Sequence, residues 1–168
     1  SFAEWMVGRG ARHLVLVGRS APTPFAQDAI AKMESAGARI LVVSADVSVR
    51  NEVDALFGRI AKELPPLRGV LHSAAVIDDH TLLKLSVTSV REVAAAKMYG
   101  AWHLHRATAR VPLDFFVLFS SAASLFGPLG QGNYAAANAF LDVLAHRRRA
   151  EGLPGLAVDW GPFSEVGL

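Results

Sequence analysis

Short runs of consecutive apolar residues recur along the chain, separated by longer segments of mixed polarity. Because these runs are continuous rather than alternating between apolar and polar positions, they predict strands that are buried on both faces. The longer segments predict helices, several of them bounded by serine, proline or glycine. The strands are expected at residues 12–17, 39–45, 69–75, 113–121 and 155–160, and the helices at 22–37, 49–63, 87–109 and 132–151.

Strand and helix alternate throughout, and this order predicts the fold class. An α/β chain of this kind forms a parallel sheet covered by helices on both faces, a three-layer α/β/α arrangement of the Rossmann-like, doubly wound type. Residues 1–7 are expected to be the end of a further helix, without a start signal of their own. Because no internal repeat and no interdomain linker is visible, residues 1–168 are expected to form a single domain.

Composition narrows the class of protein. Hydrophobic residues make up 52% of the chain and charged residues 19%, as in a packed globular protein. No run of about 18 apolar residues occurs, so neither a transmembrane helix nor a membrane partner is expected. The chain has no cysteine, which excludes disulfides and thiolate metal sites and favours a cytoplasmic setting. A net charge of +2 is too small to indicate nucleic acid, and the run at 147–149 (Arg-Arg-Arg) is expected to be a solvated helix end.

Polar side chains gather where the apolar run 113–121 ends. The run closes with Ser120 and Ser121, a loop with three glycines follows, and Tyr134 opens an Ala-rich helical segment. In open α/β sheets, ligands bind at the carboxyl ends of the strands, so this strand, loop and helix form the candidate site. The alternative is that Tyr134 simply packs near the start of a helix.

Two further side chains give Tyr134 a chemical role. Lys97 lies among alanines on the preceding long helix, where small neighbours allow close packing and let the lysine reach inward. A cation nearby favours the ionised form of a phenol. Asn138 follows Tyr134 by one helical turn, so both lie on one face. A hydroxyl, a phenol, an ammonium and an amide that converge on one pocket suit the reduction of a carbonyl.

Three other motifs have simpler explanations. Residues 8–10 (Gly-Arg-Gly) precede a strand and lack the third glycine of a dinucleotide-binding motif, which favours a turn at a helix end. His103 and His105 are two residues apart on a helix and point to different faces, so no metal site is expected. Asp78 and Asp79 fit a loop with turn-forming aspartates, with metal or acid/base chemistry as the alternative.

Six motifs together are similar to one known family. They are LVGRS at 16–20, VLHSAA at 70–75, AKMYGAWHL at 96–104, LFSSAA at 118–123, GQGNYAAANAFLD at 130–142 and DWGP at 159–162. With them the chain resembles the short-chain dehydrogenase/reductase superfamily, and more closely the ketoreductase domains of modular polyketide synthases and related fatty acid synthases. The motifs run nearly from end to end of the chain and in the right order.

The resemblance implies four catalytic residues. Ordinary superfamily members carry tyrosine and lysine four residues apart on one helix, whereas the synthase ketoreductases have lysine and asparagine exchanged. Lys97 and Asn138 match that exchange. Tyr134 would be the general acid, activated by Lys97, which would also bind the nicotinamide ribose. Ser121 would donate a hydrogen bond to the carbonyl oxygen of the substrate. Asn138 would support the proton relay, and Ser120 would have a structural role.

The resemblance also implies NADPH as the cofactor. Arg19 and Ser20 would meet its 2′-phosphate beside Gly18, whereas an acidic residue there would suit NAD. The remaining implied contacts are Asp46 and Val47 at the adenine, His72, Ser73, Ala74 and Ala75 along the ribose and nicotinamide, Gly161 and Pro162 at the carboxamide, and Lys97 and Tyr134 themselves.

The implied reaction converts a β-ketoacyl thioester on a phosphopantetheine-bound acyl carrier protein to the β-hydroxyacyl thioester. The partners would be that carrier and the other synthase domains of the same polypeptide. Phe126 and Leu129 would line the acyl entry beside Gln131. The sequence at 77–79 (Ile-Asp-Asp) resembles the Leu-Asp-Asp signature of B-type ketoreductases, with Asp79 in stereocontrol, and Phe126 replaces the tryptophan of A-type domains. A D-configured hydroxyl is therefore expected.

In the family, a first strand and a glycine-rich phosphate loop come before the helix that residues 1–7 resemble. We therefore expect an N-terminally truncated domain that lacks both, binds NADPH poorly and folds weakly on its own. Two other functions stay open from the sequence. One is a redox-inactive domain retained for structure or epimerisation, and the other is a free-standing reductase of small ketones.

Overall fold

In the computed structural model, residues 1–161 are described, and strands and helices alternate along them as the sequence predicts. All five predicted strands are present, but the third is shorter than expected and ends at His72 rather than at residue 75. The strands are β1 (His13–Gly18), β2 (Arg39–Ser44), β3 (Gly69–His72), β4 (Phe115–Ser121) and β5 (Leu156–Trp160). The helical elements are α1 (Phe2–Gly8), α2 (Pro24–Ser35), α3 (Arg50–Glu63), the 3-10 turn η1 (Leu82–Lys84), α4 (Val87–Ala94), the π-helix η2 (Ala95–Tyr99), α5 (Gly100–Thr108), α6 (Ala123–Phe126) and α7 (Gly132–Ala150).

Every strand pairing among the described residues is parallel, so the predicted α/β class is confirmed. β1 pairs with β2, beginning with His13 beside Arg39, and β3 and β5 pair with opposite edges of β4. The sheet is therefore in two pieces, β1–β2 and β3–β4–β5, and within residues 1–161 no ladder joins them. The break between β1 and β3 falls where the resemblance implies a further central strand.

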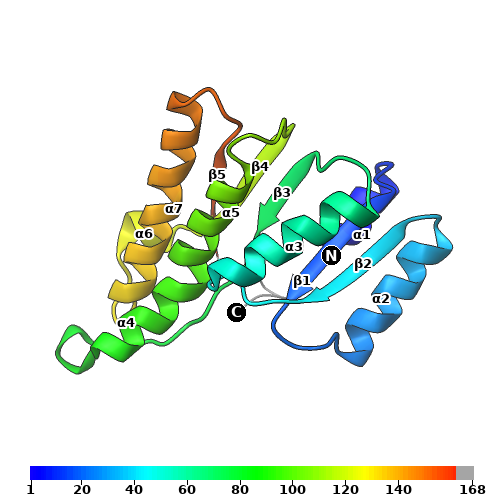
Figure 1. Cartoon of the computed structure of the whole chain (residues 1–168). Coiled ribbons are helices and arrows are strands. Elements are labelled where there is room, and N and C mark those ends of the chain that lie inside the picture. Colours follow the sequence, from blue (N-terminus) through cyan, green and yellow to red (C-terminus); the bar gives the residue numbers. More distant parts are fainter. Residues whose placement is uncertain (162–168) are drawn as a thin grey trace.

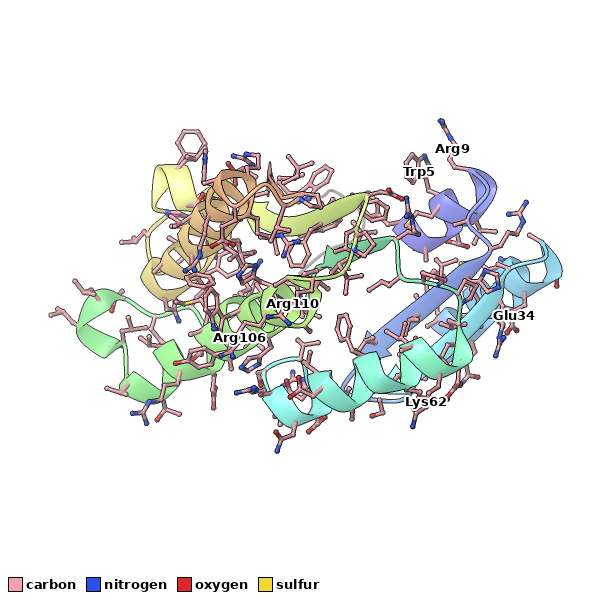
Figure 2. The ribbon with its side chains drawn as sticks, turned by 45° about the horizontal axis from the view of Figure 1, so that its top comes forward. Trp5, Arg9, Glu34, Lys62, Arg106 and Arg110 are labelled. Carbon is pink, nitrogen blue, oxygen red and sulfur yellow. The ribbon has the colours of Figure 1, made fainter. Side chains whose placement is uncertain are left out.

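Helices cover both faces of the sheet (Figure 1). Figure 2 shows Trp5 of α1 and Arg9, which follows that helix, on one side of β1 and β2, and Lys62 of α3 on the other. The larger core lies where α3, α5 and α7 meet β4, and a smaller core lies between α1, α2 and β1. The larger core contains Phe116, Leu118 and Leu141, each at most 1% exposed. Removing each such side chain from water stabilises the fold by roughly 1.5–3 kcal/mol.

The start of α1 differs from the expectation. Residues 1–7 were predicted to lack a start signal, but Ser1 caps the helix and forms a capping box with Glu4. The hydroxyl of Ser1 accepts a hydrogen bond from the backbone N–H of Glu4, and the Glu4 carboxylate reaches back to the backbone nitrogen of Ser1 at 2.6 Å. The Ser-x-x-Glu spacing is a helix-start signature, so residues 1–4 do carry a start signal.

The run of three arginines at the end of α7 is not uniformly solvated. Arg148 is fully buried, whereas the arginines on either side of it are exposed. Its Nε donates to the carbonyl of Pro154 at 2.7 Å, and its guanidinium lies 3.8 Å from the centroid of the Phe116 ring. Its Nη1 also donates to Nδ1 of His105 at 3.1 Å. Consecutive helical residues point about 100° apart, so the middle arginine faces the core.

In the part of the chain that the structure describes, no helix is both long enough and apolar enough to cross a membrane.

Two glycines allow a matched test of how tightly α7 and β5 pack. A Cβ on Gly155 would lie 2.8 Å from the carbonyl oxygen of Ala145 and 2.9 Å from Cβ of Arg148, while a Cβ on Gly58 in α3 would meet nothing within 4 Å. We expect Gly155→Ala to lower the free energy of unfolding by about 1–3 kcal/mol, because backbone must move. Gly58→Ala should raise it by about 0.5–1 kcal/mol. Denaturant unfolding of the two variants checks this, and equal effects would contradict it.

Candidate functional site

The two serines at the end of β4 face different ways, because successive side chains of a strand alternate. Ser120 is buried, and its hydroxyl donates to the backbone carbonyl of Asn138 in α7 at 3.3 Å. Ser121 is half-buried on the other face, and its hydroxyl accepts from the backbone N–H of Ala123 at 3.2 Å. Ser120 therefore ties β4 to α7, and Ser121 is the serine hydroxyl at the more open edge.

Lys97 and Tyr134 lie close together beside the C-terminal end of β4. The Lys97 side chain is only 2% exposed, and its ammonium donates to the backbone carbonyl of Phe119 at 2.8 Å. The same nitrogen lies 5.2 Å from the centroid of the Tyr134 ring. Burial lowers the pKa of Lys97 to about 8, and the negative charge of Asp142 opposes that shift. An ammonium thus lies against a phenol, in a place where water is largely excluded.

Asn138 completes the group. It is fully buried one turn after Tyr134 in α7, and its Nδ2 donates to the backbone carbonyl of Tyr134 at 2.8 Å. Its Oδ1 is buried and has no hydrogen-bond partner in the described part of the chain. The structure therefore brings Lys97, Tyr134 and Asn138 together, with an acceptor oxygen left for a further donor.

A π-helix presents Lys97. The predicted helix 87–109 is continuous in path, but its middle turn, Ala95–Tyr99, is wider than an α-helical turn. A π turn holds one residue more than an α turn and leaves carbonyls poorly matched to helical donors. The carbonyl of Lys97 lies 3.3 Å from Nε2 of the buried His72, and because a carbonyl only accepts, Nε2 carries the proton. His72 thus supports the turn from β3.

Gly100 lets that helix approach β3 closely. A Cβ there would lie 2.8 Å from the Val47 side chain and 3.1 Å from the His72 ring. Burial is also the main reason why the pKa of His72 falls to about 4. The ring is therefore neutral near pH 7 and its Nε2 faces the helix, and the role of His72 beside a cofactor stays a prediction.

The predicted cofactor residues before β3 lie at the carboxyl ends of β1 and β2. Arg19 and Ser20 are exposed just beyond Gly18, the last residue of β1, and the carbonyl of Arg19 accepts from the Ser44 hydroxyl at 3.2 Å. Asp46 accepts from the backbone N–H of Ser48 at 2.8 Å. Hydrogen bonding from Ser48, helped by the charge of Arg19, lowers the pKa of Asp46 and keeps it ionised.

The remaining predicted cofactor positions differ in exposure. Val47 is half-buried, and its carbonyl oxygen lies 3.1 Å from Nδ1 of His103 in α5. Ser73 and Ala74 are exposed after β3, Ala75 is half-buried, and Gly161 is exposed after β5. Pro162 lies outside the described residues. The side chains and backbone at these strand ends, an exposed guanidinium and a buried ammonium among them, fit an anionic dinucleotide laid along the carboxyl edge.

Hydrogen bonds join the loop after β3 to the loop before α7. Asp79 accepts from Nε2 of Gln131 at 2.8 Å, and the backbone N–H of His80 donates to the carbonyl of Gly130 at 2.9 Å. Gly130 has a φ of 84°, which favours glycine. Phe126 is 82% exposed and Leu129 is 95% exposed, so the apolar side chains predicted to line an acyl entry do stand open.

The sequence reasoning missed Asn133. Its side chain donates to the carbonyl of Asp78 at 2.9 Å and to the Ser89 hydroxyl at 3.3 Å, and it accepts from the backbone N–H of Tyr134 at 2.9 Å. It therefore joins the Asp78 loop, α4 and the start of α7. Its position directly before Tyr134, within the motif at 130–142, is the feature of the sequence that could have indicated its role. Among residues 1–161, no three His, Asp or Glu side chains are grouped so as to hold a metal ion.

A parallel α/β sheet with a serine, a tyrosine and a lysine at the carboxyl end of one strand has the architecture of the short-chain dehydrogenases and reductases. The comparisons with known proteins narrow this class. The family described as KR domain matches residues 1–165, and the chain belongs to that family, the ketoreductase domains of polyketide synthases.

Its relatives are large polyketide synthases. The chain is 44% identical over 165 residues to a mycocerosic acid synthase-like polyketide synthase of Mycobacterium tuberculosis, covering 98% of the chain and 8% of that protein. It is 46% identical over 167 residues to the polyketide synthase GfsA of Streptomyces halstedii, covering 99% of the chain and 2% of that protein. The chain thus spans less than a tenth of the length of either relative.

Solved structures agree with this assignment. A structure of A-type ketoreductases from a modular polyketide synthase superposes with a TM-score of 0.93 at 42% identity, covering 99% of this chain and 36% of that one. An N-terminal ketoreductase from the macrolactin assembly line gives a TM-score of 0.89 at 37% identity, covering 95% of this chain and 33% of that one. The predicted family and the Rossmann-like fold are therefore confirmed.

The buried His72 predicts a pH dependence of stability. Its pKa of about 4 in the folded chain lies below the ordinary value of 6.5, so the unfolded chain binds more protons between these values. The contribution to stability is complete above pH 6.5 and is lost as the pH falls toward 4, by about 3 kcal/mol in all. His72→Gln keeps a side-chain N–H donor but does not titrate, so the free energy of unfolding of this variant should vary less over this pH range.

Denaturant midpoints between pH 7 and pH 4 measure the effect, in the smallest folded polypeptide that contains residues 1–168. The pKa of His105 is also lowered, chiefly by burial, and His105 is present in both proteins, so its contribution cancels in the comparison. Parallel pH profiles for wild type and His72→Gln would contradict the prediction.

Proposed function

We propose that this chain carries the reducing site for a β-ketoacyl thioester, with NADPH as the reductant and the β-hydroxyacyl thioester as the product. The observation that carries the proposal is the Lys97 ammonium 5.2 Å from the centroid of the Tyr134 ring, beside the strand that ends in Ser121. A phenol next to a buried cation can give up a proton where a ketone oxygen gains negative charge. When bound, the nicotinamide supplies the hydride.

Each side chain then has a defined part. The Ser121 hydroxyl, at the open edge of β4, donates to the ketone oxygen and orients it toward the phenol. Tyr134 transfers the phenolic proton to that oxygen. Lys97 stabilises the negative charge left on the phenol and offers further N–H groups to a ribose hydroxyl. Asn138, with its buried Oδ1 unpaired among the described residues, accepts a hydrogen bond in the path that returns a proton.

The choice of NADPH over NADH rests on the end of β1, where Arg19 and Ser20 are both exposed. A guanidinium and a hydroxyl suit a 2′-phosphate, whereas recognition of a free 2′-hydroxyl requires an available carboxylate. The end of β1 carries Arg19 and Ser20 rather than a carboxylate, so this pair favours the phosphorylated cofactor.

An acyl carrier protein and neighbouring synthase domains are the partners that we propose. The support is the class of the relatives, which are polyketide synthases far longer than this chain. An acyl chain delivered by a carrier would enter past Phe126 and Leu129, whose open apolar surfaces lie next to Gln131.

A redox-inactive domain is the second candidate. One relative, a phenolphthiocerol synthesis polyketide synthase of Mycobacterium tuberculosis at 44% identity, is named as inactive. The retained geometry of Lys97, Tyr134 and Asn138 favours the active alternative, because a domain kept only for structure has no need of a buried ammonium against a phenol.

Removal of one hydroxyl tests the proposal. The chain has two tyrosines, Tyr134 in the site and Tyr99, which is half exposed on η2. Tyr134→Phe should lower kcat for reduction of a β-ketoacyl thioester by at least about 100-fold, because the general acid is lost. Tyr99→Phe is the matched control and should leave the rate within about twofold of wild type. A Tyr134→Phe enzyme as active as the control would exclude Tyr134 as the acid.

The stereochemistry of the product is a separate prediction. Asp79 is bonded to Gln131 at the substrate side, and Phe126 stands where A-type domains carry tryptophan, so we expect the D-configured alcohol. Two of the similar solved structures are titled A-type and A1-type ketoreductases, at 42% and 41% identity, so overall similarity does not decide the product. Chiral chromatography of the hydroxyacyl product measures it, and the L-alcohol would overturn the B-type assignment.

A further inference from the structure

The first turn of α7 is held by a side chain from inside the helix. Gln131 precedes the helix, but its side chain makes no capping bond and donates to Asp79 instead, at 2.8 Å. The first backbone N–H groups of a helix have no partner within it and need one from elsewhere. Asn133 supplies one, because its Oδ1 accepts from the backbone N–H of Tyr134 at 2.9 Å. The backbone of the proposed general acid is therefore held by the residue directly before it.

The amide nitrogen of Asn133 binds two other elements. It donates to the carbonyl of Asp78, in the loop after β3, at 2.9 Å, and to the hydroxyl of Ser89 in α4 at 3.3 Å. A primary amide has two N–H donors, so both are used while the oxygen faces Tyr134. Asn133 is only 5% exposed, so water does not readily replace a bond that is lost. One orientation of this amide satisfies all three neighbours.

Three hydrogen bonds join residues 78–80 to the start of α7, and the one from Asn133 is the buried link. The bond between Gln131 and Asp79 is exposed. The third runs from the backbone N–H of His80, an exposed residue, to the carbonyl of Gly130 at 2.9 Å. Water competes for exposed bonds, so these two contribute less to holding the loop. The position of the loop therefore depends mainly on Asn133.

Open apolar side chains flank the joined segments. Leu82 follows the loop and is 85% exposed, and Leu129 precedes α7 and is 95% exposed. An acyl chain that approaches Tyr134 from this side meets apolar surface from both segments. The direction of its approach then depends on how residues 78–80 lie relative to the phenol. Asn133 is the side chain that contacts both the loop and the backbone of Tyr134.

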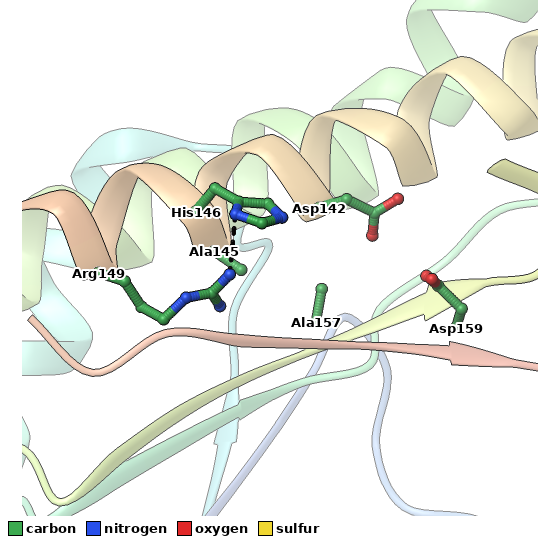
Figure 3. A pocket seen from close by; sticks show the side chains of 6 residues that line it. All are labelled: Asp142, Ala145, His146, Arg149, Ala157 and Asp159. Atoms are coloured by element: carbon green, nitrogen blue, oxygen red, sulfur yellow. Dashed lines mark hydrogen bonds between the residues drawn. The ribbon is translucent and has the colours of Figure 1, made fainter. Parts of the chain in front are cut away.

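The hollow farther along α7 does not fit this role. It measures about 100 Å³ and lies between Asp142 and Arg149 of α7 and Asp159 of β5 (Figure 3). Pockets for small molecules measure roughly 300–1,000 Å³, so this hollow is too small for an acyl chain. Inside it, Nη2 of Arg149 donates to Nδ1 of His146 at 2.9 Å. The contacts that orient a substrate are therefore to be sought at the start of α7.

We infer that Asn133 is a positioning residue of the reducing site. It fixes residues 78–80 against the start of α7, and it thereby sets which face of the ketone is presented to Tyr134. The inference rests on the proposed function for its meaning in catalysis, whereas the link between the loop and α7 stands on the hydrogen bonds alone. Asn133 acts through its neighbours, because both of its N–H groups are already engaged.

Asn133→Asp separates the loop from the helix with little change of shape. One carboxylate oxygen still accepts from the N–H of Tyr134, and a negative charge in the first turn suits the helix dipole. The other oxygen faces the carbonyl of Asp78, and two acceptors repel each other. Asn51→Asp is the matched control, because Asn51 is likewise the second residue of its helix, α3, and is exposed.

Hydrogen exchange tests the link without reference to catalysis. The smallest folded polypeptide that contains residues 1–168 is followed by mass spectrometry at pH 7. In Asn133→Asp, the amides of residues 79–84 should exchange at least about fivefold faster than in wild type, because the loop opens more often. Asn51→Asp should leave their exchange at the wild-type rate. Equal exchange of this segment in all three proteins would overturn the inference.

Kinetics with a β-ketoacyl thioester and NADPH tests the positioning role. In Asn133→Asp, KM for the thioester should rise about 5–10-fold while kcat stays within about threefold, because Tyr134 keeps its hydrogen bond. The minor enantiomer of the product should rise several-fold by chiral chromatography, and Asn51→Asp should match wild type. A lower kcat with unchanged KM and product ratio would show a merely structural role and overturn the inference.

Two further outcomes are decided by the same measurements. If Asn133→Asp does not fold, Ser89→Ala replaces it, since it removes one of the two acceptors of the Asn133 amide. It should shift exchange, KM and product ratio in the same directions by smaller factors, and wild-type values would count against the inference. If wild type reduces no thioester, the proposed function fails, and hydrogen exchange still decides whether Asn133 holds the loop.

Discussion

The buried ammonium of Lys97 is the constraint on which the site depends. A cation removed from water is costly, and the chain compensates it with the carbonyl of Phe119, the ring of Tyr134 and the charge of Asp142. These three partners come from β4 and α7, so a shift of either element would leave the charge exposed to a poorer environment. The need to compensate the buried charge of Lys97 therefore fixes how α7 lies against the end of β4.

The same lysine determines the backbone on the other side of the site. A regular helix from residue 87 to 109 has no place for the extra residue of η2, and His72 and Gly100 hold that turn against β3 and Val47. Val47 in turn contacts α5 through His103. One helical path thus joins the strand ends proposed for the adenine to the lysine proposed for the ribose. Close packing at Gly100 is what couples the two ends of the cofactor path.

Much of this could be predicted from the sequence because the strands are continuous apolar runs and the polar residues follow them directly. The features that depend on tertiary contacts could not be predicted from the sequence. The π turn lies in an Ala-rich stretch that carries no local signal for it. Arg148 is buried because its guanidinium packs on the Phe116 ring and donates to the carbonyl of Pro154. The His72 ring contacts the backbone of the helix that carries Lys97. The meeting of Lys97 with Tyr134 was expected from the small residues around Lys97 and from the family resemblance, since no periodicity links residues so far apart.

Within residues 1–161, helices rather than a strand ladder connect the two pieces of the sheet. On one face, Phe2 of α1 packs edge-on against Phe119 and Trp160, with ring centroids 4.9 and 5.9 Å away. On the other face, Val53 of α3 joins the core formed with α5, α7 and β4. Aromatic and aliphatic contacts are less directional than a hydrogen-bonded ladder, so they allow small shifts between the pieces. Lys97 donates a hydrogen bond to the carbonyl of Phe119, the residue that Phe2 covers, so the proposed reducing group is attached to β3–β4–β5, while Arg19 and Asp46 lie at the ends of β1 and β2. Among residues 1–161, the contacts of α1 and α3 therefore set how the residues proposed for the phosphate and those proposed for the ribose lie relative to one another.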